Sequence, residues 1–305
     1  MKSSGKALAN AHQMHWKDIA WNGIRFESPR DWELGMIGPR YLMLEYRFEP
    51  VLEIKWGRVK GRFSPRTYLS SLTTHTEDQR ELSARECSLP DGWKKSLDAF
   101  EATGFSWQGK SFAGKGVILY CPVCHHATLI QFYFKTPMKT ESWQEHLLAS
   151  FQDHRSDNQV EWKVFDIRAS IPSEFKLLSH RFESGKYEMT FASNGQKITL
   201  YRYGPASILL KKEDLSRFTS RMAGVFRHDH WRIVQNDSKV VEWEAGQSAT
   251  PWLSWFHLMK GTPPIRWIRF WHVEEKNRIL GLKAEGREPF PQHFLKQICE
   301  GYESL

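Results

Sequence analysis

One pattern of eleven residues occurs twice in the chain. Residues Ile24–Leu34 read IRFESPRDWEL, and residues Ile167–Leu177 read IRASIPSEFKL. Ile, Arg, Pro, an aromatic residue and Leu fall at matching positions, and 143 residues separate the two copies. The match extends to the far end of each half, where EHLL at residues 145–148 corresponds to QHFL at residues 292–295. The sequence therefore predicts a tandem of two similar domains.

Length and composition agree with this division. A chain of 305 residues suffices for two domains of about 150 residues, each with its own core. Apolar residues make up 40% and charged residues 26%, as in ordinary globular proteins. We predict a polar leader over residues 1–16, a first repeat over 17–156 and a second over 157–305. The boundary lies in the polar stretch Arg155–Gln159.

Turn and cap signals predict antiparallel strands with flanking helices in each repeat. We expect a single first strand over Asp18–Ser28 and a hairpin that turns at Glu49–Pro50. In the second repeat, Asn194–Gly195 predicts the matching turn, because both residues tolerate positive φ. Ser64–Pro65 predicts a helix start, since the hydroxyl caps free amides and proline needs none.

Each repeat is expected to continue with further strands and to close with an amphipathic helix. The expected strands cover residues 96–107, 116–121 and 127–135 in the first repeat, and 231–244, 265–272 and 278–285 in the second. The closing helices are expected over residues 141–154 and from Pro291. The fold class is therefore α+β, with two α/β/α sandwich domains, each a mostly antiparallel sheet with flanking helices.

This element order, together with Pro29 and Trp32 in one repeat and Pro172 and Phe175 in the other, resembles the PsbP-like fold. That α/β/α sandwich is seen in the photosystem II extrinsic protein, in a Ran-binding nuclear import factor and in many bacterial proteins of unknown role. The resemblance implies a scaffold that binds other proteins and no shared active site. The chain departs from the pattern in being doubled and in carrying a CxxC motif.

The CxxC motif is Cys121-Pro122-Val123-Cys124, at a hairpin tip between two apolar strands. Two cysteines at this spacing converge on one tetrahedral metal such as zinc. His125 and His126 follow directly and are predicted to complete the site. Further candidate ligands elsewhere in the chain are His12, His15, His75 and Cys87. At an offset of 150 residues, the second repeat has Trp271 and Glu274 at the cysteine positions.

Two other interpretations of the cysteine pair stay open. A dithiol oxidoreductase or redox sensor would use Cys121 as the attacking thiolate, which requires it to be exposed with a lowered pKa. The β-rich residues after Cys124 are not the helix that a thioredoxin-type motif needs. In the remaining interpretation, the two cysteines are inert, reduced thiols.

Other motifs do not identify a catalytic site. Residues 104–111 fit GxxxxGK[ST], but no helix follows to hold phosphates, so we interpret this stretch as a hairpin turn. His228-Asp229-His230 is interpreted as a polar turn. The sequence contains no GxSxG, HExxH or GxGxxG. We therefore expect a protein that is not an enzyme, although missing motifs do not exclude one.

Nucleic-acid binding is a further alternative. The net charge is +8, spread over both halves without a run of five like charges. The aromatic and basic residues that could stack on bases are Trp252, Trp255, Phe256, Arg266, Trp267, Arg269 and Trp271. Aromatic residues at alternating strand positions more often form the core of a sheet, and no motif of a nucleic-acid-binding class is present.

We expect a cytoplasmic protein. Residues 1–16 contain no apolar run of the length of a signal-peptide core, and no segment has 18 consecutive apolar residues. The preferred hypothesis is a non-enzymatic binding or adaptor protein with an unknown protein partner, in which zinc at Cys121 and Cys124 stiffens a hairpin that contacts the partner.

Overall fold

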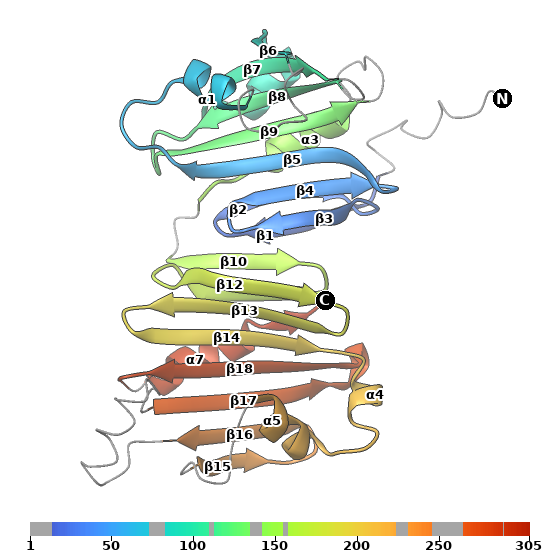
Figure 1. Ribbon diagram of the computed structural model, residues 1–305, viewed down its shortest axis with the longest axis vertical. Helices are drawn as coiled ribbons and strands as arrows, with labels where there is room; N and C mark the ends of the chain where they lie inside the picture. Colours follow the sequence, from blue (N-terminus) through green and yellow to red (C-terminus); the bar gives the residue numbers. More distant parts are fainter. Residues whose placement is uncertain are drawn as a thin grey trace, which may run out of the picture. The chain divides into compact units, whose positions relative to one another are not determined.

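The computed structural model describes residues 14–72, 83–109, 113–134, 142–154, 158–223, 231–245, 265–288 and 290–305. The chain divides into two compact units, Met1–Ser156 and Asp157–Leu305. In each unit, helices lie beside antiparallel strands (Figure 1). The predicted α+β class, with two similar sandwich units, is confirmed.

The first unit contains a hairpin and a seven-stranded sheet. The hairpin is β1 (Trp16–Trp21) with β2 (Ile24–Pro29). The sheet has the order β3-β4-β5-β9-β8-β7-β6. Its strands are β3 (Glu33–Gly38), β4 (Tyr41–Tyr46), β5 (Glu49–Arg58), β6 (Ser83–Glu86), β7 (Glu101–Gln108), β8 (Ala113–Tyr120) and β9 (His126–Phe134). The helices are α1 (Pro65–Leu72), α2 (Asp91–Ser96) and α3 (Ser142–Ser150).

The second unit repeats this plan. The hairpin is β10 (Gln159–Val164) with β11 (Ile167–Pro172), and β19 (Glu303–Ser304) adds to β11. The sheet has the order β12-β13-β14-β18-β17-β16-β15. Its strands are β12 (Lys176–Glu183), β13 (Lys186–Ser193), β14 (Gln196–Tyr203), β15 (Trp231–Asn236), β16 (Val240–Ala245), β17 (Ile265–Val273) and β18 (Arg278–Gly286). The helical segments are α4 (Ala206–Leu209), α5 (Leu215–Ala223), η3 (Glu274–Lys276) and α7 (Gln292–Glu300).

Helices cover both faces of the sheet in the first unit. On one face, Phe132 of β9 meets Trp93 of α2 and Trp143 of α3, with ring centroids 5.3 and 5.5 Å apart. On the other face, Leu69 of α1 belongs to a core cluster with Phe105 and other apolar residues of β7, β8 and β9. The alternation of side chains along a strand produces these two apolar faces, and each needs a helix to cover it.

The expected single strand over Asp18–Ser28 is wrong, because the chain reverses at Asn22–Gly23. These residues have φ values of 44° and 96°, and the strands on either side form the hairpin β1–β2. The expected strand 231–244 is likewise a hairpin, β15–β16. The turn expected at Glu49–Pro50 lies instead at Arg47–Phe48, both with positive φ.

Other local predictions are confirmed. Residues 194–195 form the turn between β13 and β14, and α1 begins at Pro65 after Ser64, whose Oγ lies 3.5 Å from the amide nitrogen of Thr67. The GxxxxGK[ST] stretch begins inside β7, and its residues Lys110 and Ser111 lie outside the described residues.

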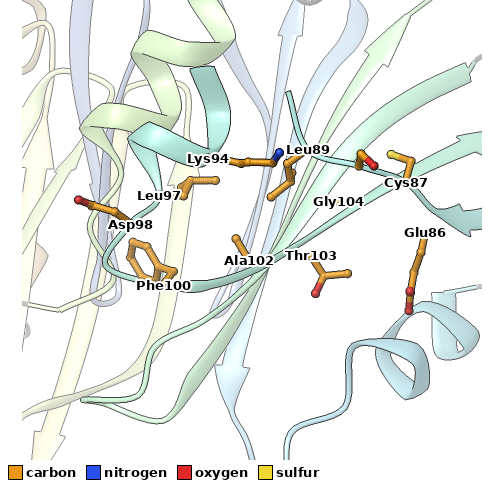
Figure 2. Close-up of a pocket in the computed structure, with 11 residues that line it drawn as sticks. Glu86, Cys87, Leu89, Lys94, Leu97, Asp98, Phe100, Ala102, Thr103 and Gly104 are labelled. Carbon is orange, nitrogen blue, oxygen red and sulfur yellow. The ribbon is translucent and has the colours of Figure 1, made fainter. Parts of the chain in front are cut away.

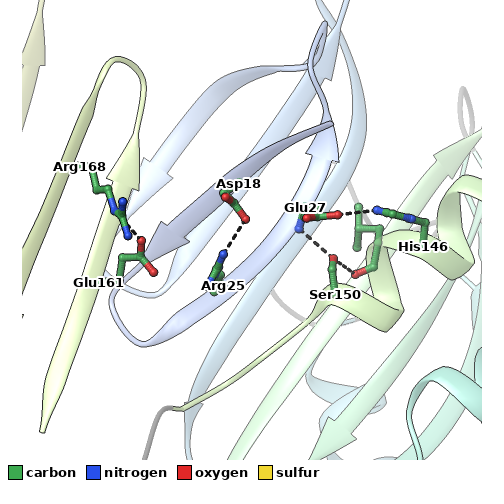
Figure 3. Close-up of polar contacts among 8 residues, drawn as sticks. Asp18, Arg25, Glu27, His146, Ser150, Glu161 and Arg168 are labelled. Carbon is green, nitrogen blue, oxygen red and sulfur yellow. Dashed lines mark hydrogen bonds and ion pairs between the residues drawn. The ribbon is translucent and has the colours of Figure 1, made fainter. Parts of the chain in front are cut away.

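Equivalent ion pairs occur in the two N-terminal hairpins (Figure 3). In β1–β2, Arg25 Nη2 lies 3.0 Å from Asp18 Oδ1, and in β10–β11, Arg168 Nε lies 3.0 Å from Glu161 Oε1. Both pairs are diagonal across an antiparallel ladder, a geometry in which long side chains of opposite charge meet. The 143-residue spacing of the sequence repeat thus recurs in its side-chain contacts.

The strand register corrects the correspondence around the cysteines. Equivalent lines of paired residues cross the two sheets, namely Leu52–Phe132–Lys115 and Ile198–Ala284–Trp267. Phe132 and Ala284 differ by 152 positions, two more than the spacing used for the sequence comparison. Cys121 therefore corresponds to Val273 and Cys124 to Lys276, in place of Trp271 and Glu274.

Candidate metal centre

The cysteine pair lies in the short turn between β8 and β9. The amide of Cys121 donates to the carbonyl of His126, and the amide of His125 donates back to the carbonyl of Cys121, both at 2.9 Å. His125 adopts a left-handed φ of 57°, which lets the chain reverse within this turn. Because the backbone closes on itself, Cys121 and Cys124 are held close together at the tip.

A second segment reaches this turn from the end of α3. Gln152 exchanges two backbone hydrogen bonds of 2.8 Å with Arg25 of β2, which anchors the chain after the helix. Asp153 and His154 follow directly. Residues from two segments about 30 positions apart are thus brought to one place.

Cys121, Cys124, Asp153 and His154 form what we call the donor cluster. One potential ligand atom from each lies within 4.8 Å of all the others. Cys121 Sγ lies 3.7 Å from His154 Nδ1, and Cys124 Sγ lies 3.0 Å from Asp153 Oδ2. Asp153 Oδ1 lies 2.6 Å from the same His154 nitrogen. Cys121 and Asp153 are buried, and the side chain of His154 is 40% exposed. This group could hold a metal ion.

The three short contacts of the cluster are compatible with a tetrahedral ion after a small expansion. Bonds of about 2.3 Å to sulfur and about 2.0 Å to nitrogen or oxygen place neighbouring ligand atoms roughly 3.3 to 3.8 Å apart. The Cys121–His154 distance of 3.7 Å falls in that range. The two contacts of Asp153, at 3.0 and 2.6 Å, are hydrogen bonds that an ion would replace, and they need to open by less than about 1 Å.

Opposing contacts act on the pKa of the Cys124 thiol. Burial raises the pKa of this thiol, and the hydrogen bond that it donates to Asp153 raises the pKa further. The backbone amide of His126 donates to the same sulfur and lowers the pKa. Such an amide contact also stabilises a metal-bound thiolate. A cation bound by both groups would displace the proton that the Cys124 thiol donates to Asp153.

The two predicted histidines lie beside the cluster. Neither His125 nor His126 belongs to the group of mutually close donors found among the described residues. His125 Nδ1 lies 2.9 Å from the hydroxyl of Tyr120, and burial lowers the pKa of His126. Asp153 and His154 lie close to the two cysteines instead, and no motif in the sequence connects this pair to the CxxC.

The remaining candidate ligands do not enter the cluster. Cys87 is exposed, and neither it nor His15 is a member of the group. His12, His75 and the His228-Asp229-His230 stretch lie outside the described residues.

The oxidoreductase interpretation finds no support in this geometry. It requires an exposed Cys121 as the attacking thiolate, whereas Cys121 is only 3% exposed. Its partner Cys124 has a raised pKa, so its thiol keeps its proton at neutral pH. Reactive cysteines are accessible and have lowered pKa values.

The described members of the set considered for nucleic-acid binding make contacts within the second unit. Trp267 Nε1 donates to Glu242 at 2.9 Å, and Arg269 pairs with the same carboxylate at 3.0 Å. Arg266 stacks on the ring of Trp231 at 5.0 Å. The ring of Trp271 contacts Tyr302. Trp252, Trp255 and Phe256 lie outside the described residues.

A groove of about 660 Å³ lies elsewhere in the first unit, beside α2 and β7 (Figure 2). Charged side chains of both signs line it, with Glu86, Lys94 and Asp98 among them. Lys94 is paired with Asp91 at 3.2 Å. The groove contains no member of the donor cluster.

Comparisons with known proteins show similarity of fold alone. No family model matches the chain. No curated protein matches it either. Among solved structures, the immunity protein TplEi of the T6SS from Pseudomonas aeruginosa is 10% identical, with 95% of this chain and 97% of that chain covered and a TM-score of 0.35. The Ran-binding protein Mog1p of Saccharomyces cerevisiae is 9% identical, with 49% and 96% covered and a TM-score of 0.32.

A third structure, from Bacteroides thetaiotaomicron, is 9% identical, with 50% of this chain and 55% of that chain covered and a TM-score of 0.31. None of these three proteins is PsbP. At these identities and TM-scores the likeness does not bear on what the chain binds. Among the described residues, no helix has the length and apolar character needed to cross a membrane.

Proposed function

We propose that this protein is a non-enzymatic scaffold that binds another protein and holds a structural zinc ion at Cys121, Cys124, Asp153 and His154. The observation that carries the proposal is the donor cluster itself, in which four protein groups meet. Structural zinc sites have four protein ligands, whereas catalytic sites keep a position open for water or substrate. A cluster that fills all four positions supports a structural role.

The ligand types favour zinc over other divalent ions. Two thiolates and one imidazole are soft or intermediate donors, which calcium and magnesium do not select. With two thiolates, one carboxylate and a neutral imidazole, a zinc site carries a formal charge of about −1. Arg40 and Arg58 are close enough to lower the pKa of neighbouring His126. The same positive charges would offset the negative charge of the zinc site.

The turn that carries the cysteines also presents an apolar side chain outward. Val123 lies between the two cysteines and is 73% exposed. With Cys121 and Cys124 bound to zinc, Val123 would be held in one position at the hairpin tip. A preordered apolar contact loses less conformational entropy on association than a mobile one. We assign the tip as a contact point for a protein partner on these grounds.

Zinc affinity measured against a colorimetric chelator tests the site. The wild type is expected to bind zinc, and Cys121→Ser/Cys124→Ser to lose it. Asp153→Asn and His154→Ala are each expected to weaken binding at least about tenfold, the loss typical of a removed ligand or orienting group. The matched variant His125→Ala/His126→Ala is expected to bind as the wild type does. Unchanged affinity in Asp153→Asn and His154→Ala would refute this ligand set.

Partner binding is tested with a partner isolated by cross-linking to the wild-type chain. We expect Val123→Asp to weaken the purified complex at least about tenfold, because it places a charge in an apolar contact. Glu101→Asp, at an exposed position on β7 that keeps its charge, serves as the control. Equal affinities for Val123→Asp and wild type would remove the tip from the interface.

A further inference from the structure

The two units close their C-terminal ends differently. In the second unit, β19 pairs with β11 through Ile167↔Ser304 and Arg168↔Glu303. The amide of Leu305 then donates to the carbonyl of Asp166 at 2.8 Å. The last residues of this unit are therefore held as a short strand along the N-terminal hairpin.

The equivalent segment of the first unit makes a single bridge. Arg25 corresponds to Arg168, and it pairs with Gln152 as Arg168 pairs with Glu303. The two residues that follow are therefore equivalent in the two units, so Asp153 corresponds to Ser304 and His154 to Leu305. No strand is assigned to residues 151–154 of the first unit.

All four positions of the donor cluster change together between the units. In the second unit, Val273, Lys276, Ser304 and Leu305 replace the four donors. Val273 and Leu305 offer no metal ligand, and zinc sites are built from cysteine, histidine and carboxylate groups. One unit thus has a strand at this place, and the other has a complete ligand set without the strand.

We infer, on the basis of the zinc site proposed above, that zinc replaces β19 in the first unit. The ion is a clasp that ties residues 152–154 to the β8–β9 turn and so holds the end of the first repeat against its own N-terminal hairpin. Two ligands come from each of the two segments, so the ion would link them by four bonds. Without it, the segment after α3 is held here by the bridge at Arg25 and Gln152 and by the weaker contacts Cys121–His154 and Cys124–Asp153.

Hydrogen exchange of the full chain tests the clasp, with zinc-loaded and zinc-stripped protein compared by NMR or by mass spectrometry with electron-based fragmentation. The amides of Arg25, Gln152, Cys121 and His125, which donate the hydrogen bonds of this region, are expected to exchange at least tenfold faster without zinc. The amide of Leu305 serves as the internal control and is expected to keep its rate. Cys121→Ser/Cys124→Ser is expected to match the stripped protein whether or not zinc is added.

The outcomes separate the clasp from the site. One zinc bound per chain, with unchanged exchange at Gln152 and Arg25, would overturn the clasp and leave the zinc site standing. A zinc-dependent change at Leu305 equal to that at Gln152 would also overturn it, because the effect would not be confined to the unit with the ligands. Absence of zinc binding would overturn the site and the clasp together.

Discussion

The carboxylate of Glu53 is buried on β5 and has several polar neighbours. The hydroxyl of Tyr133 donates to it at 2.6 Å, and Lys55 Nζ lies 2.6 Å from its other oxygen. Glu53 is 5% exposed. Burial raises the pKa of the Tyr133 hydroxyl, and the negative charge of Glu53 raises it further. The folded chain therefore holds this phenol in its neutral form.

Tyr133 should make the stability of the first unit depend on alkaline pH. In the unfolded chain the phenol ionises near pH 10, whereas the folded chain keeps it neutral to higher pH. Its contribution is thus complete below about pH 10 and is lost as the pH rises further. From pH 8 to pH 11, the unfolding free energy of the wild type should fall by about 1 kcal/mol more than that of Tyr133→Phe, because the variant has no phenol at this position to ionise. Urea unfolding followed by circular dichroism measures this difference, and identical losses would contradict it.

Only part of the donor cluster could be predicted from the sequence. The pattern Cys121-x-x-Cys124 predicts that the two sulfurs approach each other, and they lie within 4.8 Å in the structure. Their separation depends on one local turn. Asp153 and His154 could not be predicted, because a long-range pairing between Gln152 and Arg25 brings them to the turn. A residue next to a ligand in sequence, such as His125, is not thereby next to it in space.

Among the elements, the sequence predicts some chain reversals and not others. Asn-Gly predicts the reversal at residues 194–195, whereas the expected continuous strand over Asp18–Ser28 runs through the same dipeptide at residues 22–23. The structure has a reversal there, between β1 and β2. At Arg47–Phe48, positive φ falls on residues with no turn preference, so the sequence carried no signal there. The helix starts at Pro65 and next to Pro291 were predicted, because these prolines act locally, whereas α2 (Asp91–Ser96) was not.

Gly116 permits the close packing of β7, β8 and β9. A Cβ atom at this position would lie 2.4 Å from the ring of Phe105 and 2.5 Å from the carbonyl oxygen of Ile130. We expect Gly116→Ala to destabilise the protein by about 1 to 3 kcal/mol, as overpacking does. Gly57→Ala on β5 is the matched control, because its nearest atom would be the end of Arg40 at 3.9 Å. Urea midpoints provide the measurement, and equal midpoints for the two variants would refute the packing argument.

In the whole molecule, the two units share one arrangement of strands and helices but differ in how their C-terminal segments are held. Tandem architecture and fold class followed from the repeated Ile24–Leu34 stretch, because strand and helix patterns are local and were copied twice. The donor cluster of the first unit depends on four positions. Since Val273, Lys276, Ser304 and Leu305 replace the donors in the second unit, we expect one zinc ion per chain in place of two.

Zinc K-edge X-ray absorption, combined with elemental analysis, tests whether the donor cluster holds zinc. Protein purified without chelator or affinity metal should contain about one zinc per chain, with two sulfur ligands at about 2.3 Å and two nitrogen or oxygen ligands at about 2.0 Å. In His125→Ala/His126→Ala the spectrum should be unchanged, whereas in His154→Ala the shell of light ligands should change. Metal-free protein, or zinc bound without sulfur ligands, would contradict the account.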